Sequence, residues 1–79
     1  MRTINVGLIG LGTVGSGVIA ILRRHGEQFR TRAGVDLALV KCADRNHARA
    51  AELGITPATF TTDAADVIAD PSIDVVIEL

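Results

Sequence analysis

The sequence predicts an α/β fold in which a parallel sheet is covered by helices on both faces. The expected strands are short, continuous apolar runs without the alternation of a half-exposed strand, which is typical of buried parallel strands. Segments with helical periodicity separate these runs, so strands and helices alternate along the chain. The chain has 79 residues, of which 48% are hydrophobic. This length allows one small core and no second domain.

The first strand and helix follow from the composition of the first third of the chain. Ile4 to Ile9 is a β-branched run suited to a strand. A helix is expected from about Thr13 to His25, ending near Gly26, because four apolar residues share one helical face: Val14, Val18, Ile21 and Leu22. The polar stretch from Glu27 to Gly34 is then expected to connect this helix to a second strand, Val35 to Cys42.

A short helix and a short strand are expected next. Asn46 can cap a helix that continues through Leu53, and Gly54 then suits a left-handed residue after the helix. Pro57 lies in the turn that follows. Thr59 to Thr61 is expected to form a short third strand.

A third helix and a fourth strand complete the expected pattern. Thr62 or Asp63 can cap a helix around Val67. The Asp70-Pro71-Ser72 sequence ends this helix, because proline disfavours helical backbone at the residue before it. Ile73 to Ile77 is the last expected strand.

A glycine-rich sequence lies between the first strand and the first helix and matches G-x-G-x-x-G. The match alone is weak, but the preceding strand and the following helix are the context of a dinucleotide-binding turn. Gly10 would allow the tight turn, Gly12 would leave room for a pyrophosphate, and Gly15 would let the helix pack closely on the strand. The alternative is a purely structural glycine-rich turn.

The chain is therefore predicted to be the first half of a Rossmann NAD(P)-binding fold. The helix that starts at the turn would present N–H groups and a positive dipole end to the phosphates of the cofactor. The cofactor-binding residues predicted in this turn are Gly10, Leu11, Gly12, Thr13, Val14 and Gly15.

Asp44 and Arg45 are the residues predicted at the adenosine end. Asp44 lies just past the second strand, where a carboxylate could accept hydrogen bonds from the ribose hydroxyls. It follows Gly15 by 29 residues, which is more than the usual spacing of about 20. The alternative is an Asp that only caps the next helix. Arg45 could stack on adenine or pair with a 2′-phosphate, whereas Asp44 would repel that phosphate, so the preference between NAD and NADP stays open.

Other reactive side chains predict no further site. His25 and His47 have no partner at metal-binding spacing, and Cys42 lies in an apolar strand without a nearby base, so no metal or catalytic residue is predicted. Glu78 could reach the crevice at the strand ends or simply face solvent. Four arginines are expected at the opposite end of the sheet from the cofactor: Arg23, Arg24, Arg30 and Arg32.

Composition excludes several classes of partner. The net charge of -1, with no Trp or Tyr, argues against nucleic acid. A single cysteine excludes an internal disulfide and suggests a reducing, cytoplasmic location. Thr3 to Leu22 carries no charge, but its five glycines disfavour a membrane helix or a signal peptide.

The sequence resembles the amino-terminal NAD(P)-binding part of homoserine dehydrogenases. The string GLGTVGSGV after the first strand carries most of this resemblance, supported by Arg32-Ala33-Gly34-Val35 and by residues 70–79. The family interconverts aspartate semialdehyde and homoserine by NAD(P)-dependent hydride transfer, on the way to threonine and methionine. The resemblance implies that residues 10–15 hold the pyrophosphate and that Asp44 and Arg45 meet the adenosine.

The resemblance also implies that residues 1–79 are a partial Rossmann domain. The last expected strand stops without a cap or turn. In the family, the rest of the cofactor domain and a substrate and dimerisation domain follow, and these supply the catalytic residues, so we expect the 79 residues alone to be inactive. Two alternatives are an NAD(P)-binding half of a sugar or inositol dehydrogenase and a nucleotide-sensing regulatory domain.

Overall fold

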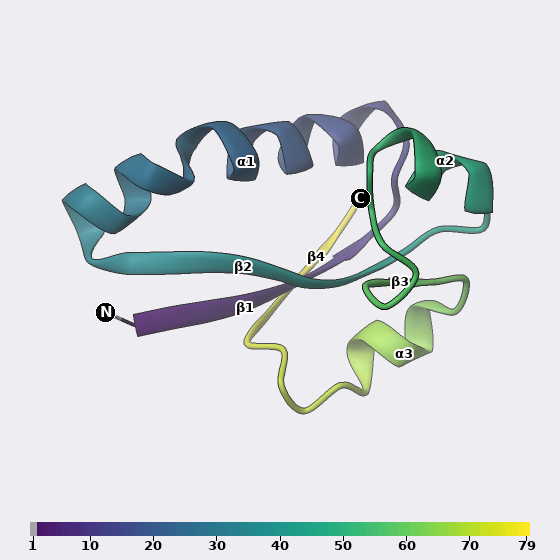
Figure 1. The fold of residues 1–79 in the computed structure, drawn as a ribbon. Helices are drawn as coiled ribbons and strands as arrows, with labels where there is room; N and C mark the ends of the chain where they lie inside the picture. Colours follow the sequence, from purple (N-terminus) through teal and green to yellow (C-terminus); the bar gives the residue numbers. More distant parts are fainter. Residues whose placement is uncertain (1) are drawn as a thin grey trace.

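The computed structural model describes residues 2–79 and contains four strands and three helices. In chain order these elements are β1 (Arg2–Ile9), α1 (Thr13–Ala33), β2 (Val35–Ala43), α2 (His47–Glu52), β3 (Phe60–Thr61), α3 (Ala64–Ile68) and β4 (Val75–Glu78). All strand pairs are parallel, and the sheet order is β3-β2-β1-β4. α1 covers one face of this sheet and α3 the other (Figure 1). The predicted fold class is therefore confirmed.

The hydrophobic core cluster lies on the face of the sheet that α1 and α2 cover (Figure 1). Leu8 from β1, Ile19 from α1 and Cys42 from β2 are almost completely buried there. On the opposite face, α3 packs against β1 through Val67. A Cβ at Gly7 would lie only 2.6 Å from Val67 Cγ1, so the absence of a side chain at Gly7 permits this close packing.

The first helix is longer than the sequence pattern predicts. We expected it to end near Gly26, with a polar connection over residues 27–34, but α1 continues to Ala33. The residue that ends it is Gly34, whose φ of 65° is in the left-handed region that glycine adopts without strain. Gly26 stays inside the helix, where a glycine weakens helical structure without ending it. Thr31 Oγ1 donates to the Glu27 carbonyl at 2.8 Å within this last part of the helix.

The remaining elements follow the predictions to within one or two residues. Asn46 caps α2 by accepting from the Ala48 N–H at 3.0 Å, and Asp63 caps α3 by accepting from Ala65 N–H at 2.9 Å. Gly54 has the predicted left-handed backbone, with φ of 69°. None of the helices within residues 2–79 combines the length and the apolar content needed to cross a bilayer.

Polar contacts fix the entry of the chain into β4. The Asn5 N–H donates to Asp74 Oδ2 at 2.8 Å, and the Asp74 N–H donates back to the Asn5 carbonyl at 2.8 Å. Asn5 Nδ2 also donates to the Ser72 carbonyl at 2.8 Å. β4 therefore begins at Val75, two residues later than predicted, and pairs from Val6–Val75 to Ile9–Glu78.

Candidate dinucleotide-binding site

The glycine-rich turn joins β1 to α1 at the carboxyl edge of the sheet. Gly10 has φ of 103°, a conformation that residues with side chains rarely adopt, and its N–H donates to the Ala43 carbonyl at 2.8 Å. A Cβ at Gly15 would lie 2.1 Å from the Gly10 carbonyl oxygen. The first and third glycines are therefore required by the turn itself and by the packing of α1 on it.

Gly12 differs from these two glycines because no packing contact within residues 2–79 requires it. A Cβ at Gly12 would meet no heavy atom within 4 Å, and its φ of -67° is open to any residue. The side of the turn where this Cβ would lie is open space. This is the location at which the sequence predicts the close approach of a pyrophosphate.

The amino end of α1 also lacks the cap that the other two helices have. Asn46 and Asp63 satisfy backbone N–H groups in the first turns of α2 and α3. At Gly12, the N-cap residue of α1, no side chain of residues 2–79 plays this part. The first N–H groups of a helix have no intrahelical acceptor. This 21-residue helix therefore offers donors and a positive dipole end to an anion.

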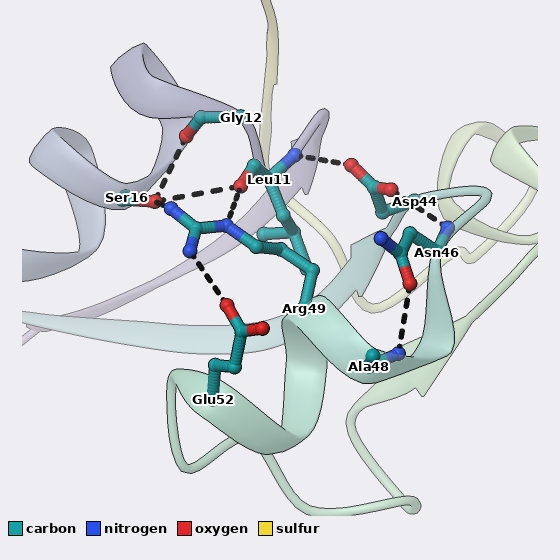
Figure 2. A network of polar contacts seen from close by, with 8 residues as sticks. All are labelled: Leu11, Gly12, Ser16, Asp44, Asn46, Ala48, Arg49 and Glu52. Atoms are coloured by element: carbon teal, nitrogen blue, oxygen red, sulfur yellow. Dashed lines mark hydrogen bonds and ion pairs between the residues drawn. The ribbon is translucent and has the colours of Figure 1, made fainter.

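Asp44 lies beside this turn, one residue beyond β2. Its Oδ2 accepts from the Leu11 N–H at 2.7 Å and its Oδ1 accepts from the Asn46 N–H at 2.8 Å (Figure 2). These bonds, from Asn46 first and Leu11 second, lower the pKa of Asp44 below its usual value, so the carboxylate stays charged at neutral pH. A carboxylate has about four acceptor positions, so Asp44 keeps capacity for hydroxyl donors.

A cavity of about 510 Å³ opens at the same edge of the sheet. Its lining consists of Ile9, Gly10, Ala43, Asp44, Arg45, Thr62, Asp63 and Ala64. The structure thus brings the first glycine of the turn, the charged carboxylate of Asp44 and the exposed Arg45 to one hollow. A polar, concave site at the carboxyl ends of parallel strands is where α/β folds bind ligands.

Arg49 is a residue of this region that the sequence analysis missed. Its Nε donates to the Leu11 carbonyl at 2.8 Å, and Nη2 donates to Ser16 Oγ (Figure 2). Nη1 donates to Glu52 Oε2 at 2.9 Å within the same short helix. No motif includes Arg49, and only the packing of α2 against the start of α1 reveals these contacts.

Arg23, Arg30 and Cys42, for which the sequence predicts no role in the site, do not line its cavity. Arg23 Nη1 donates to the Leu53 carbonyl at 2.8 Å. Arg30 forms two ion pairs: its Nη2 lies 3.2 Å from Glu27 Oε2, and its Nε lies 4.0 Å from Asp36 Oδ1, near the start of β2. Cys42 is fully buried, and burial raises the pKa of its thiol. Within residues 2–79, no three His, Cys, Asp or Glu side chains are placed to hold a metal ion.

Glu78 lies at the end of a strand, and each of the two histidines lies beside one neighbouring side chain. Glu78 is exposed and lies in register with Ile9, at the carboxyl end of β4. The His47 ring packs edge-on against Phe60 with a centroid separation of 5.5 Å. His25 Nδ1 lies 3.2 Å from Gln28 Oε1 on α1.

Comparison with known proteins identifies relatives of the whole chain. The chain is 43% identical to a homoserine dehydrogenase from Methylobacillus glycogenes and 39% identical to one from Bacillus subtilis, over all 79 residues in both cases. These matches cover 19% and 18% of the two relatives. The chain therefore spans about a fifth of the length of the curated proteins it matches.

Solved structures give the same result. A homoserine dehydrogenase from Thiobacillus denitrificans superposes with a TM-score of 0.84 at 46% identity, over 99% of this chain and 18% of that one. A homoserine dehydrogenase from S. aureus superposes with a TM-score of 0.87 at 31% identity, over 99% of this chain and 19% of that one. A levoglucosan dehydrogenase in complex with NADH gives 0.73 at 28% identity, over 99% of this chain and 21% of that one.

A family match supports these relationships. Residues 10–79 match the family described as "Homoserine dehydrogenase, NAD binding domain". This match begins at the first glycine of the turn and includes Asp44, Arg45 and Arg49. The chain belongs to the family of homoserine dehydrogenase NAD-binding domains.

Proposed function

We propose that this domain binds the pyrophosphate and adenosine of NAD(P) for an enzyme that interconverts aspartate semialdehyde and homoserine. The observation that carries the proposal is the uncapped amino end of α1, which opens beside Gly12 next to the charged Asp44 carboxylate. Family membership supports the same cofactor.

The residues of the turn would act through their backbones. We assign the pyrophosphate to the N–H groups at the start of α1, with Gly10, Leu11, Gly12, Thr13, Val14 and Gly15 forming the phosphate side of the site. Backbone donors at a helix amino end favour an anion without a lysine. The only lysine of the chain, Lys41, is paired with Asp70 at 3.1 Å instead.

We assign the adenosine to the cavity beyond the turn. Asp44 would accept hydrogen bonds from the ribose hydroxyls while it keeps its bond to Leu11, and Arg45 would meet adenine or a 2′-phosphate. When bound, the nicotinamide of the cofactor supplies the hydride for reduction of the aldehyde and accepts it when the alcohol is oxidised. Residues 1–79 would bind and orient the dinucleotide and would not contact the carbon that is reduced or oxidised.

The chain matches about one fifth of its relatives' length. We assign substrate binding, catalysis and self-association to the remaining four fifths of the enzyme. The buried Cys42 agrees with the cytoplasmic location that we propose for the enzyme. The sugar dehydrogenase alternative has less support, because the levoglucosan dehydrogenase superposes less closely and with lower identity than the homoserine dehydrogenases.

Replacement of Gly12 tests this proposal on the full-length protein. Gly12→Val should abolish measurable NAD(H) binding and leave the melting temperature nearly unchanged, because the new side chain fills open space that the pyrophosphate would occupy. Gly17→Val is the matched control, since a Cβ at Gly17 in the same helix also meets nothing within 4 Å. Titration of NADH fluorescence measures both variants. Unchanged affinity in Gly12→Val would overturn the pyrophosphate assignment.

A further inference from the structure

We propose that Arg49 is a positioning residue, which holds the glycine-rich turn in the shape that directs its N–H groups toward a pyrophosphate. This inference rests on the proposed function, because it assigns a role within the same site. No motif predicts it, and it arises from contacts between α2 and the turn (Figure 2).

Both backbone polar groups of Leu11 are held by side chains from the segment after β2. Asp44 accepts from the Leu11 N–H at 2.7 Å, and Arg49 Nε donates to the Leu11 carbonyl at 2.8 Å. The Leu11 side chain is itself completely buried in the core. Leu11 is therefore fixed at three points, although it lies in a turn that contains glycines on both sides.

The direction of the next N–H group follows from peptide geometry. The peptide unit is planar and trans, so its carbonyl and its N–H point in opposite directions. Because Arg49 holds the Leu11 carbonyl, the Gly12 N–H in the same peptide unit points away from Arg49. Glycine at position 12 would otherwise leave this peptide free to rotate.

Ser16 extends the same restraint to the following peptide. Ser16 Oγ accepts from Arg49 Nη2 and donates to the Gly12 carbonyl at 2.8 Å. The same carbonyl also accepts from the Ser16 N–H at 2.9 Å, which is the first backbone bond of α1. The Thr13 N–H shares a peptide unit with that carbonyl and therefore points in the opposite direction, away from Ser16. Arg49 thus holds the Leu11–Gly12 peptide directly, and through Ser16 it supports the next peptide, which the first backbone bond of α1 also holds.

A guanidinium suits this task better than an ammonium group. Its donors lie in one rigid plane, and here three of its nitrogens reach three different acceptors: the Leu11 carbonyl, Ser16 Oγ and Glu52 Oε2. Glu52 fixes the plane from within α2. A lysine keeps the charge but cannot hold the turn and Ser16 in this fork geometry.

The test compares variants of the full-length protein by their Kd for NADH, ADP and adenosine. Arg49→Lys should weaken NADH and ADP about 10-fold, which corresponds to about 1.4 kcal/mol. Arg49→Met should weaken both ligands further, and Ser16→Ala should have a smaller effect in the same direction. Adenosine lacks the pyrophosphate, so its affinity should not change in any of the three variants.

Arg23→Lys is the matched control. Arg23 also donates to a backbone carbonyl at 2.8 Å, that of Leu53, but it does not contact the turn. We expect this variant to bind NADH like the wild type even where its stability falls as much as that of Arg49→Lys.

Each other outcome contradicts the inference in a different way. Wild-type affinity for NADH in Arg49→Met would show that the turn keeps its shape without Arg49. Equal weakening of adenosine would place Arg49 at the adenosine end, and equal weakening by Arg23→Lys would reduce its role to general stability. A wild-type protein that binds neither NADH nor ADP would instead overturn the proposed function, and this inference with it.

Discussion

Asp44 and Leu11 are separated by 33 residues in the sequence and joined by a hydrogen bond of 2.7 Å between a carboxylate oxygen and a backbone N–H. The bond connects the end of β2 to the glycine-rich turn after β1, the two places where the sequence predicts the ribose and the pyrophosphate. The same carboxylate therefore shapes the phosphate side of the candidate site while it faces the cavity beside Arg45. A change at Asp44 is expected to affect both ends of the dinucleotide.

Replacement of Asp44 should change the cofactor preference. Asp44→Ala should weaken NADH by roughly 10- to 100-fold, since hydrogen bonds to a charged group contribute roughly 1.5–3 kcal/mol. NADPH should weaken less, because the substitution also removes the negative charge that repels a 2′-phosphate near Arg45. Titration of the full-length protein with both cofactors measures the two Kd values. Asp36→Ala, at the opposite end of β2, is the control and should change neither Kd. If Asp44→Ala weakened NADPH more than NADH, Asp44 would not be the ribose acceptor.

Replacement of Gly26 and of Gly34 by alanine should change the free energy of unfolding in opposite directions. Gly26→Ala should raise the free energy of unfolding by about 0.5–1 kcal/mol, because Gly26 lies inside the helix. Gly34→Ala should lower it by about 1–2 kcal/mol, because Gly34 has a left-handed backbone with φ of 65°. A Cβ at Gly34 would meet no described atom within 4 Å, so the cost comes from the backbone and not from a clash. Urea unfolding measures both changes. Destabilisation by Gly26→Ala would contradict the continuous helix.

The pH dependence of stability should contain a contribution from Asp70. Hydrogen bonds from the Ser72 hydroxyl and N–H, and then the contact with Lys41, lower the pKa of Asp70 to about 2. The folded-state pKa is below the usual value of about 3.9, so this contribution is fully present above pH 4 and is lost as the pH falls toward 2. Asp70→Asn should therefore be less stable than the wild type at neutral pH, and the difference should shrink between pH 4 and pH 2. Urea unfolding across this pH range measures it, and a constant difference would contradict the assignment.

The local patterns of the sequence were sufficient to predict most of the fold. Continuous apolar runs located the strands, and Asn46 and Asp63 marked the starts of α2 and α3 because capping depends on residues close in sequence. The predicted end of α1 was wrong because either of two glycines, Gly26 or Gly34, could end the helix by composition. Only the backbone shows that Gly34 takes the left-handed conformation.

The candidate site was predicted less completely than the fold. Gly10, Gly15 and Asp44 could be placed beside one another because strand ends in a parallel sheet meet at one edge. Arg49 could not be found in this way, since its contacts depend on how α2 packs against α1 and on the direction of a long side chain. The bond from Leu11 to Asp44 was missed for the same reason: it joins a backbone group to a distant side chain.

The central position of β1 in the sheet has a consequence for the order of folding. Its neighbours are β2, which follows soon in the chain, and β4, whose pairing with it spans about 69 residues between Asn5 and Asp74. Chains grow from the amino end during synthesis, and pairings between distant segments form slowly. β1 is the first of these four strands to be synthesised, and one of its edges stays unpaired until β4 has been made. The mutual hydrogen bonds of Asn5 and Asp74 fix the register at which that late strand is added.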